Sequence, residues 1–176
     1  MDNHASGIIV EINGKIPVFG EDCWIAPNAA IIGNVITGNH CSFWFGSVIR
    51  GDVNSIRIGH NVNVQDLALI HCTFENASTS IGNEVSIGHG AIVHGCTIHD
   101  RVLIGMGAIV MDGAVVHSGS IIAAGAVVLE GTLVEPGSLY AGTPAKKVKS
   151  LDPGESAEKL ARIASNYRMY SSWYRK

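Results

Sequence analysis

Residues 98–138 read IHDRVLIGMGAIVMDGAVVHSGSIIAAGAVVLEGTLVEPGS and repeat every six residues. A branched aliphatic residue opens each hexad, and glycine stands three positions after six of the seven openings. The openings are Ile98, Ile104, Val110, Val116, Ile122, Val128 and Val134. A repeat this short has room for one short strand and one corner. Stacked strands and corners of this kind form a parallel β-helix, whose ladders bury the aliphatic side chains of successive rungs.

The same repeat continues less regularly toward the N-terminus. Further aliphatic residues six apart are Ile25 and Ile31, then Ile58, Val64 and Ile70, then Ile81, Ile87 and Val93. The step from Ile70 to Ile81 is one hexad plus five extra residues. The polar stretch FENASTS (74–80) is predicted to form the extra loop. Residues 1–24 are predicted to form a lead-in strand or hairpin, with Asn13 and Gly14 in the turn.

The C-terminal segment carries the start signal of a helix. Asp152 is a good N-cap, Pro153 suits the first helical position, and Glu155 completes a capping box. An apolar stripe at helical spacing follows, made of Leu160, Ile163, Ala164, Tyr167, Tyr170 and Trp173 or Tyr174. We therefore expect a β-helix with its lead-in over 1–150. Over 151–176 we expect a helix packed on the coil or on a neighbouring subunit.

Composition narrows the classes of function. Apolar residues make up 47% of the chain. They never run to the roughly 18 in a row that a membrane-spanning helix needs. Twelve basic and fifteen acidic residues give a formal net charge of −3, without a basic block. This balance argues against nucleic acid and anionic membranes as partners. The four cysteines lack CxxC spacing, so we expect reduced thiols and a cytoplasmic location.

Two of the eight histidines occupy the same place in the repeat. His71 follows Ile70 and His94 follows Val93, so each comes directly after an inward aliphatic residue. Their separation equals one coil of three hexads plus the extra residues of the loop. This arithmetic places His94 one rung from His71 on the same face, about 4.8 Å away. Two imidazoles at that spacing can share one metal ion.

A third histidine fails the same test. His89 lies one hexad before His94 and therefore faces a different side of the coil. It could reach the pair on a neighbouring chain, if coils pack side by side around a threefold axis. Three histidines with one open water position are typical of a zinc ion that activates water for hydrolysis or hydration. The alternative is three surface histidines near an interface.

At these residues the chain resembles the γ-class carbonic anhydrases of the hexapeptide-repeat superfamily. The motifs that carry the resemblance are WFGSVIRGD (44–52), NVQD (63–66), His71, IGHGAIVHGC (87–96), IGMGAIVMDGA (104–114) and AGTPAK (141–146). The resemblance covers roughly residues 11–150 and is that of a short-loop branch. It implies a left-handed parallel β-helix, a homotrimer and one metal ion at each subunit interface. It also implies that His71 and His94 come from one subunit and His89 from the next.

The resemblance assigns roles to further residues. Gln65 matches a glutamine that hydrogen-bonds the metal-bound hydroxide. Asn63, two residues earlier and on the same side of the strand, matches a residue that helps to orient the substrate. Tyr167 matches a tyrosine that helix-bearing members bring toward the metal, with core packing as the alternative. Charged residues that match interface ion pairs, with ordinary surface pairs as the alternative, are Arg50, Asp52 and Asp66, the last as the partner of Arg50.

The activity implied is that of a carbonate dehydratase, a lyase that hydrates CO2 to bicarbonate with a hydroxide bound to zinc, iron or cobalt. One departure is that Glu75 and Glu84 do not form the long acidic loop that carries a proton-transfer glutamate in well-known members. Proton transfer would then need another route, or turnover would be slow. Two alternatives share the fold: an acyl-CoA thioesterase or acyltransferase, and a non-catalytic trimeric assembly protein held together by the metal. The extra loop contains no histidine, which argues against an acyltransferase.

Overall fold

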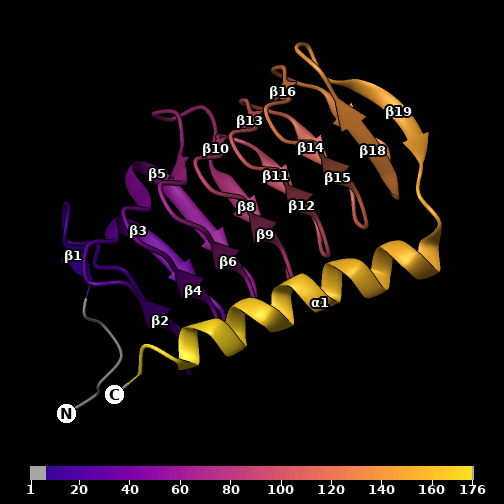
Figure 1. Ribbon diagram of the computed structural model, residues 1–176. Coiled ribbons are helices and arrows are strands. Elements are labelled where there is room, and N and C mark those ends of the chain that lie inside the picture. The colour runs from indigo at the N-terminus through magenta and orange to yellow at the C-terminus, as the bar shows by residue number, and fades with distance from the viewer. Residues whose placement is uncertain (1–6, 176) are drawn as a thin grey trace.

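The computed structural model describes residues 7–175, except for the side chain of Glu155. The chain winds into a parallel β-helix with one long helix alongside it (Figure 1). The strands are β1 (Ile8–Val10), β2 (Trp24–Ile25), β3 (Ala30–Thr37), β4 (Ser42–Phe43), β5 (Val48–Ile58), β6 (Asn63–Val64), β7 (Leu69–His71), β8 (Thr79–Ile81), β9 (Ser86–Ile87), β10 (Ile92–His94), β11 (Thr97–Ile98), β12 (Leu103–Ile104), β13 (Ile109–Val110), β14 (Val115–Val116), β15 (Ile121–Ile122), β16 (Val127–Val128), β17 (Leu133–Val134), β18 (Ser138–Ala141) and β19 (Lys146–Ser150).

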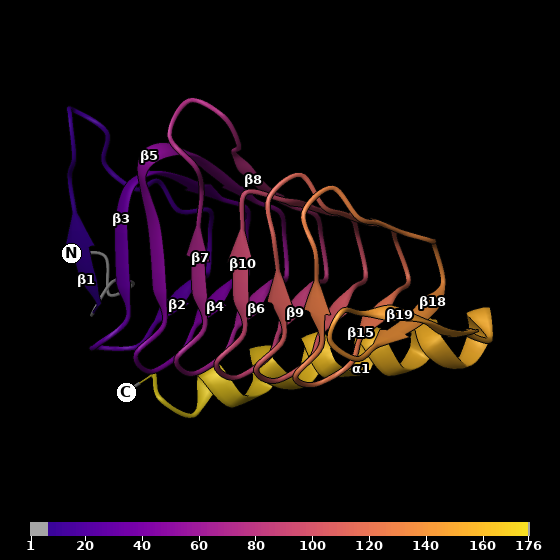
Figure 2. The ribbon, with the colours of Figure 1, turned by 90° about the horizontal axis from the view of Figure 1, so that it is seen from above.

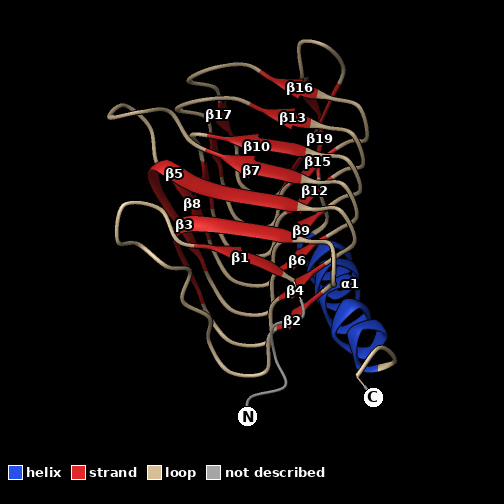
Figure 3. Cartoon of the chain, turned by 90° about the vertical axis from the view of Figure 1, so that its left-hand side faces the viewer, coloured by secondary structure: helices blue, strands red, loops and turns tan. Residues whose placement is uncertain are grey.

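The strands stack into three parallel ladders, one for each face of the coil. The first face contains β3, β5, β7, β10, β13 and β16, as Figure 3 shows, and the second contains β2, β4, β6, β9, β12, β15 and β18. The third contains β8, β11, β14 and β17, and the long strand β5 turns the corner and pairs with both β7 and β8. Strand β19 closes the C-terminal end by antiparallel pairing with β18. The expected fold class, a left-handed β-helix of hexapeptide repeats with a C-terminal helix, is confirmed.

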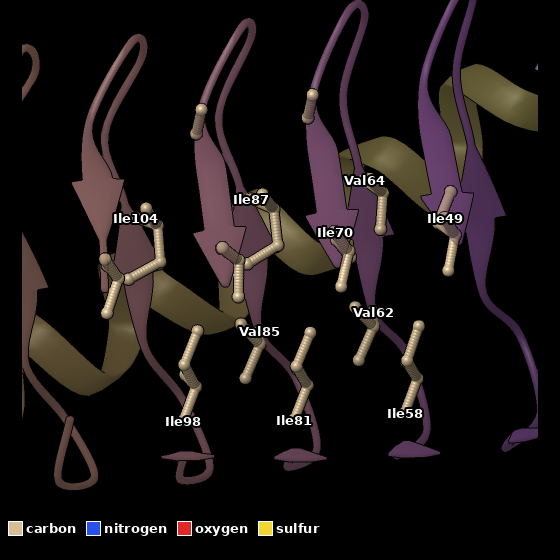
Figure 4. Close-up of a cluster of buried hydrophobic side chains, with 14 of the residues drawn as sticks. Ile49, Ile58, Val62, Val64, Ile70, Ile81, Val85, Ile87, Ile98 and Ile104 are labelled. Atoms are coloured by element: carbon tan, nitrogen blue, oxygen red, sulfur yellow. The ribbon is translucent and has the colours of Figure 1, made fainter. Parts of the chain in front are cut away.

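The core is a column of aliphatic side chains, stacked rung on rung (Figure 4). The residues that open the hexads point inward, and they include Ile70, Ile87, Ile98 and Ile104, all essentially without exposed surface. Each such side chain stabilises the fold by about 1.5–3 kcal/mol through its burial. The corners need a left-handed backbone, and Gly107 supplies it because it has a positive φ.

The insertion lies where the repeat predicts it, and the lead-in turn lies where the Asn13-Gly14 pair predicts it. A loop leaves the coil after β7 and returns at β8, which begins at Thr79, so the last two residues of the stretch expected to form the loop belong to a strand instead. Its base is closed by an antiparallel bridge between Thr73 and Ala77. A second bridge joins Ile12 to Lys15 and confirms the predicted turn in the lead-in segment, whose first six residues lie outside the described part.

Helix α1 (Pro153–Ser172) runs along the second face for most of the length of the coil (Figures 1 and 2). Asp152 accepts a hydrogen bond from the backbone N–H of Gly154 (2.9 Å), as an N-cap does. Glu155, which was expected to complete the capping box, is not among the residues whose side chains the structure describes. The buried side of the helix, which includes Leu160 and Ala164, packs on β4, β6 and β9. Among the residues that the structure describes, no helix combines the length and the apolar character that crossing a membrane requires.

The core column generates a stability prediction. Ile104→Ala should lower the free energy of unfolding by about 2–5 kcal/mol, because it removes a fully buried side chain from a ladder that cannot collapse without losing register. Urea unfolding at a fixed protein concentration measures this loss. Leu133→Ala is the control, because Leu133 is 66% exposed. Its truncation should cost less than about 0.5 kcal/mol. Equal losses in the two variants would contradict the inward ladder as the source of stability.

Candidate metal centre

The first cluster of the candidate site lies on the first face. Strands β7 and β10 pair in parallel with His71 opposite His94, as the coil arithmetic predicted. His71 Nδ1 lies 3.1 Å from His94 Nε2, and the ring centroids are 5.1 Å apart. The extruded loop removes the extra residues from the ladder, so the register of the two strands is kept.

Carboxylates hold the outer nitrogens of both rings. Asp52 is 3.0 Å from His71 Nε2 through Oδ1 and 2.5 Å from the Arg50 guanidinium through Oδ2. On the other ring, His94 Nδ1 pairs with Asp112, which also accepts a hydrogen bond from the Thr73 hydroxyl. Burial alone would raise the pKa of each carboxyl group. The hydrogen bonds from Arg50 and His71 to Asp52, and from Thr73 and His94 to Asp112, hold both pKa values below the ordinary value.

An ionised carboxylate only accepts hydrogen bonds, so the proton of each imidazole sits on the nitrogen that faces its aspartate. The inner nitrogens, His71 Nδ1 and His94 Nε2, then point lone pairs at each other across 3.1 Å. Two lone pairs at that distance repel each other, and a shared metal ion or a shared proton relieves the repulsion. Neutral imidazoles with carboxylates behind them are the ligands that zinc-type ions prefer, so these residues fit a metal ion.

The second cluster lies at the corner where the second face meets the first. His89 Nδ1 is 2.9 Å from Asp66 Oδ2, and the Tyr167 hydroxyl from α1 is 3.2 Å from His89 Nε2. Gln65 precedes Asp66 and is buried, and its amide donates to Asn63 Oδ1 (3.0 Å). The structure therefore brings these residues, all selected from the sequence, to one corner, with Asp66 as the carboxylate behind His89.

A cavity of about 340 Å³ opens beside this corner, between the second face and α1. Gln65, His89 and Tyr167 form its polar part, and Met106 and Ile163 are among its apolar walls. Burial, and then the negative charge of Asp66, raise the pKa of Tyr167 to about 12. The phenol therefore stays protonated at neutral pH.

An aromatic contact supports the position of Tyr167. The Trp44 ring packs edge-on against the tyrosine, with ring centroids 5.2 Å apart. Trp44 is buried at the corner after β4, so it forms a fixed surface of the coil for the helix side chain to rest on. Tyr167 therefore does both things considered for it: its ring packs on Trp44, and its hydroxyl lies within hydrogen-bond distance of His89.

The two clusters do not meet within one chain. Over residues 7–175 of a single chain, no three His, Cys, Asp or Glu side chains converge as metal ligands. Within the chain, Arg50 pairs with Asp52 and Asp66 pairs with His89, and the pair of Arg50 with Asp66 at a subunit interface stays a prediction. Asp112 was missed at the sequence level, although its position one coil length after His94 was an available signal.

The coil of six-residue repeats is that of a hexapeptide-repeat protein. The family described as bacterial transferase hexapeptide (six repeats) matches residues 17–51 and 95–130. A carbonic anhydrase of Geobacillus kaustophilus is 40% identical over 168 residues, which cover 96% of this chain and 91% of that protein. The chain belongs to the γ-class carbonic anhydrase-like family of hexapeptide-repeat proteins.

Two further relatives set the scale of the similarity. Gamma carbonic anhydrase 1, mitochondrial, of Arabidopsis thaliana is 39% identical over 164 residues, and the aligned part spans 90% of this chain but 59% of the plant protein. The crystal structure of a hexapeptide transferase family protein from Anaplasma phagocytophilum superposes with a TM-score of 0.90 at 40% identity. That match covers 95% of this chain and 98% of the other.

Proposed function

We propose that the protein is a metal-dependent carbonic anhydrase that hydrates CO2 reversibly to bicarbonate, at a site shared between the subunits of a cytoplasmic homotrimer. The observation that carries the proposal is the close approach of His71 Nδ1 and His94 Nε2, 3.1 Å apart, with a carboxylate on the other nitrogen of each ring, as in two ligands of one metal ion. His89 of a neighbouring subunit would complete a set of three histidines. Similarity to the carbonic anhydrase of Geobacillus kaustophilus over 96% of the chain supports the reaction class.

The apolar character of the first face supports association. Outward side chains of successive strands form an aliphatic ladder made of Val48, Leu69, Ile92, Ile109 and Val127. Beside it, the line that contains His71 and His94 continues into Met111 and Leu129, which are 39% and 47% exposed. A continuous apolar surface of this kind favours burial against another copy of the chain. Threefold closure would bring the corner of one coil, with His89, onto the first face of the next.

The residues divide the chemistry between them. Zinc, iron or cobalt, when bound, supplies a hydroxide nucleophile at neutral pH. The three histidines would hold the ion, each with a carboxylate on its other ring nitrogen. Gln65, whose amide donates a hydrogen bond to Asn63, would orient the hydroxide by a hydrogen bond of its own. The apolar walls of the cavity suit CO2 and keep bulk water away, and the protonated Tyr167 donates a hydrogen bond beside it.

One experiment separates this proposal from the other functions that the fold allows. Protein purified anaerobically is analysed for metal, and CO2 hydration and acyl-CoA hydrolysis are assayed on the same sample. About one metal ion per subunit, with hydration that is lost on chelation, supports a carbonic anhydrase. Metal-dependent acyl-CoA hydrolysis without CO2 hydration would favour a thioesterase, and bound metal without either activity would favour an assembly protein.

A subunit-mixing experiment tests whether the site is shared. His71→Ala and His89→Ala should each abolish metal binding and hydration when present alone. When the two variants are dissociated, mixed and reassociated, some interfaces join an intact His71–His94 pair to an intact His89, so part of both the metal content and the activity should return. Mixing His71→Ala with His94→Ala is the control, because both changes damage the same cluster and no mixed interface is intact. If the shared-site mixture recovers nothing, the three ligands do not come from two chains.

Gln65→Ala tests the orientation of the hydroxide. The variant should keep its metal and its trimeric state but lose about 10²-fold in the rate of CO2 hydration, because an orienting hydrogen bond is removed while the metal still supplies most of the stabilisation. Stopped-flow hydration, metal analysis and sedimentation measure the three quantities. Unchanged rates of both CO2 hydration and acyl-CoA hydrolysis at full metal occupancy would exclude the role assigned to Gln65.

A further inference from the structure

All three candidate histidine ligands have a carboxylate on one ring nitrogen. The pairs are His71 with Asp52, His89 with Asp66, and His94 with Asp112. The first two aspartates are among the residues to which the family resemblance assigns interface ion pairs. Asp112 is not, and it lies on the coil after the one that holds its histidine.

The fold makes room for Asp112 at the corner that follows β13. A Cβ placed on Gly95, the residue after His94, would lie 2.7 Å from the carboxyl carbon of Asp112. Any side chain at Gly95 would therefore push the carboxylate away from His94. The absence of a side chain at this corner allows the close approach of Asp112 to the imidazole.

Both oxygens of Asp112 have partners. Oδ1 pairs with His94 Nδ1, and Oδ2 accepts the hydrogen bond of the Thr73 hydroxyl. Thr73 is itself fixed at the base of the extruded loop, because its N–H donates to the carbonyl of Ala77 (2.9 Å) and its carbonyl accepts from the Asn54 side chain (3.2 Å). The carboxylate is thus held at both oxygens and cannot rotate away without breaking one of these bonds.

We infer that Asp112 is a positioning residue of the metal centre: held by Thr73, it fixes the ring orientation of His94 and the tautomer that leaves Nε2 free to bind a metal ion. The metal-binding part of this inference rests on the proposed function, whereas the tautomer does not. Removing a carboxylate behind a metal-ligating histidine typically weakens metal binding by about 10–100-fold. The link through Thr73 also makes the base of the extruded loop part of the support of His94.

The tautomer is measured on the metal-free protein by long-range ¹⁵N–¹H NMR of the histidine rings. In the parent protein, His94 should carry its proton on Nδ1. Asp112→Ala should shift the proton toward Nε2 and raise the dissociation constant for zinc about 10–100-fold. Asp112→Asn, which keeps an acceptor oxygen, should preserve the tautomer and retain most of the affinity. Thr73→Val should give a smaller loss than Asp112→Ala.

Glu130→Gln is the matched control, because Glu130 is exposed one coil further on and loses the same charge. It should leave the tautomer and the zinc affinity unchanged, whereas a general electrostatic effect would change the affinity in this variant too. An Nδ1-protonated His94 and a dissociation constant within about threefold of the parent in Asp112→Ala would overturn the inference. If that variant fails to fold, Asp112→Leu decides by the same criterion, because it removes the acceptor oxygens and keeps a side chain of similar size. Tautomer and affinity changes in a protein without CO2 hydration would uphold this role while overturning the proposed function.

Discussion

The parallel register between successive coils is the constraint on which every other feature depends. A rung-to-rung spacing of about 4.8 Å leaves little tolerance, because each inward aliphatic side chain packs on the one above and the one below. The chain therefore keeps its hexads in line and expels the extra residues as a loop after β7. That same register sets His71 opposite His94, so the packing of the core and the geometry of the histidine pair have one cause.

The aspartates beside His71 and His94 decide which ring nitrogens can bind a metal ion. Two neighbouring imidazoles in water would exchange tautomers freely, and nothing in a ladder prevents that. Asp52 and Asp112 remain ionised because their hydrogen bonds outweigh the cost of burial, and as acceptors they draw the protons of His71 and His94 outward. The resulting concentration of lone pairs on the first face is unfavourable without a cation. The aliphatic ladder beside it is likewise poorly suited to water, so the same face has two reasons to be covered.

Helix α1 and the residues that follow it contact the N-terminal coils of the β-helix. Its last turns meet the N-terminal coils, where Asp22 pairs with Arg168 and Arg175 and where Tyr174 packs among the rings of Trp24, Trp44 and Phe45. These contacts hold the helix against the second face, and Tyr167 points from it toward His89. The cavity beside Gln65 therefore has one rigid wall made by the coil and one wall whose position depends on contacts made at the helix end.

Local signals in the sequence were sufficient for the fold and for part of the site. The six-residue period determined the β-helix, the position of the insertion and the stacking of His71 on His94, because in a solenoid sequence distance converts directly into spatial distance. Capping residues determined where α1 begins. The partners of the side chains could not be read in this way. The pairing of Asp112 with His94 and Thr73, and of Asp66 with His89, was decided by how corners and rotamers bring charged groups together in three dimensions. The separation of His89 from the other two histidines follows from the period, but the cavity beside it exists only because α1 packs on the second face.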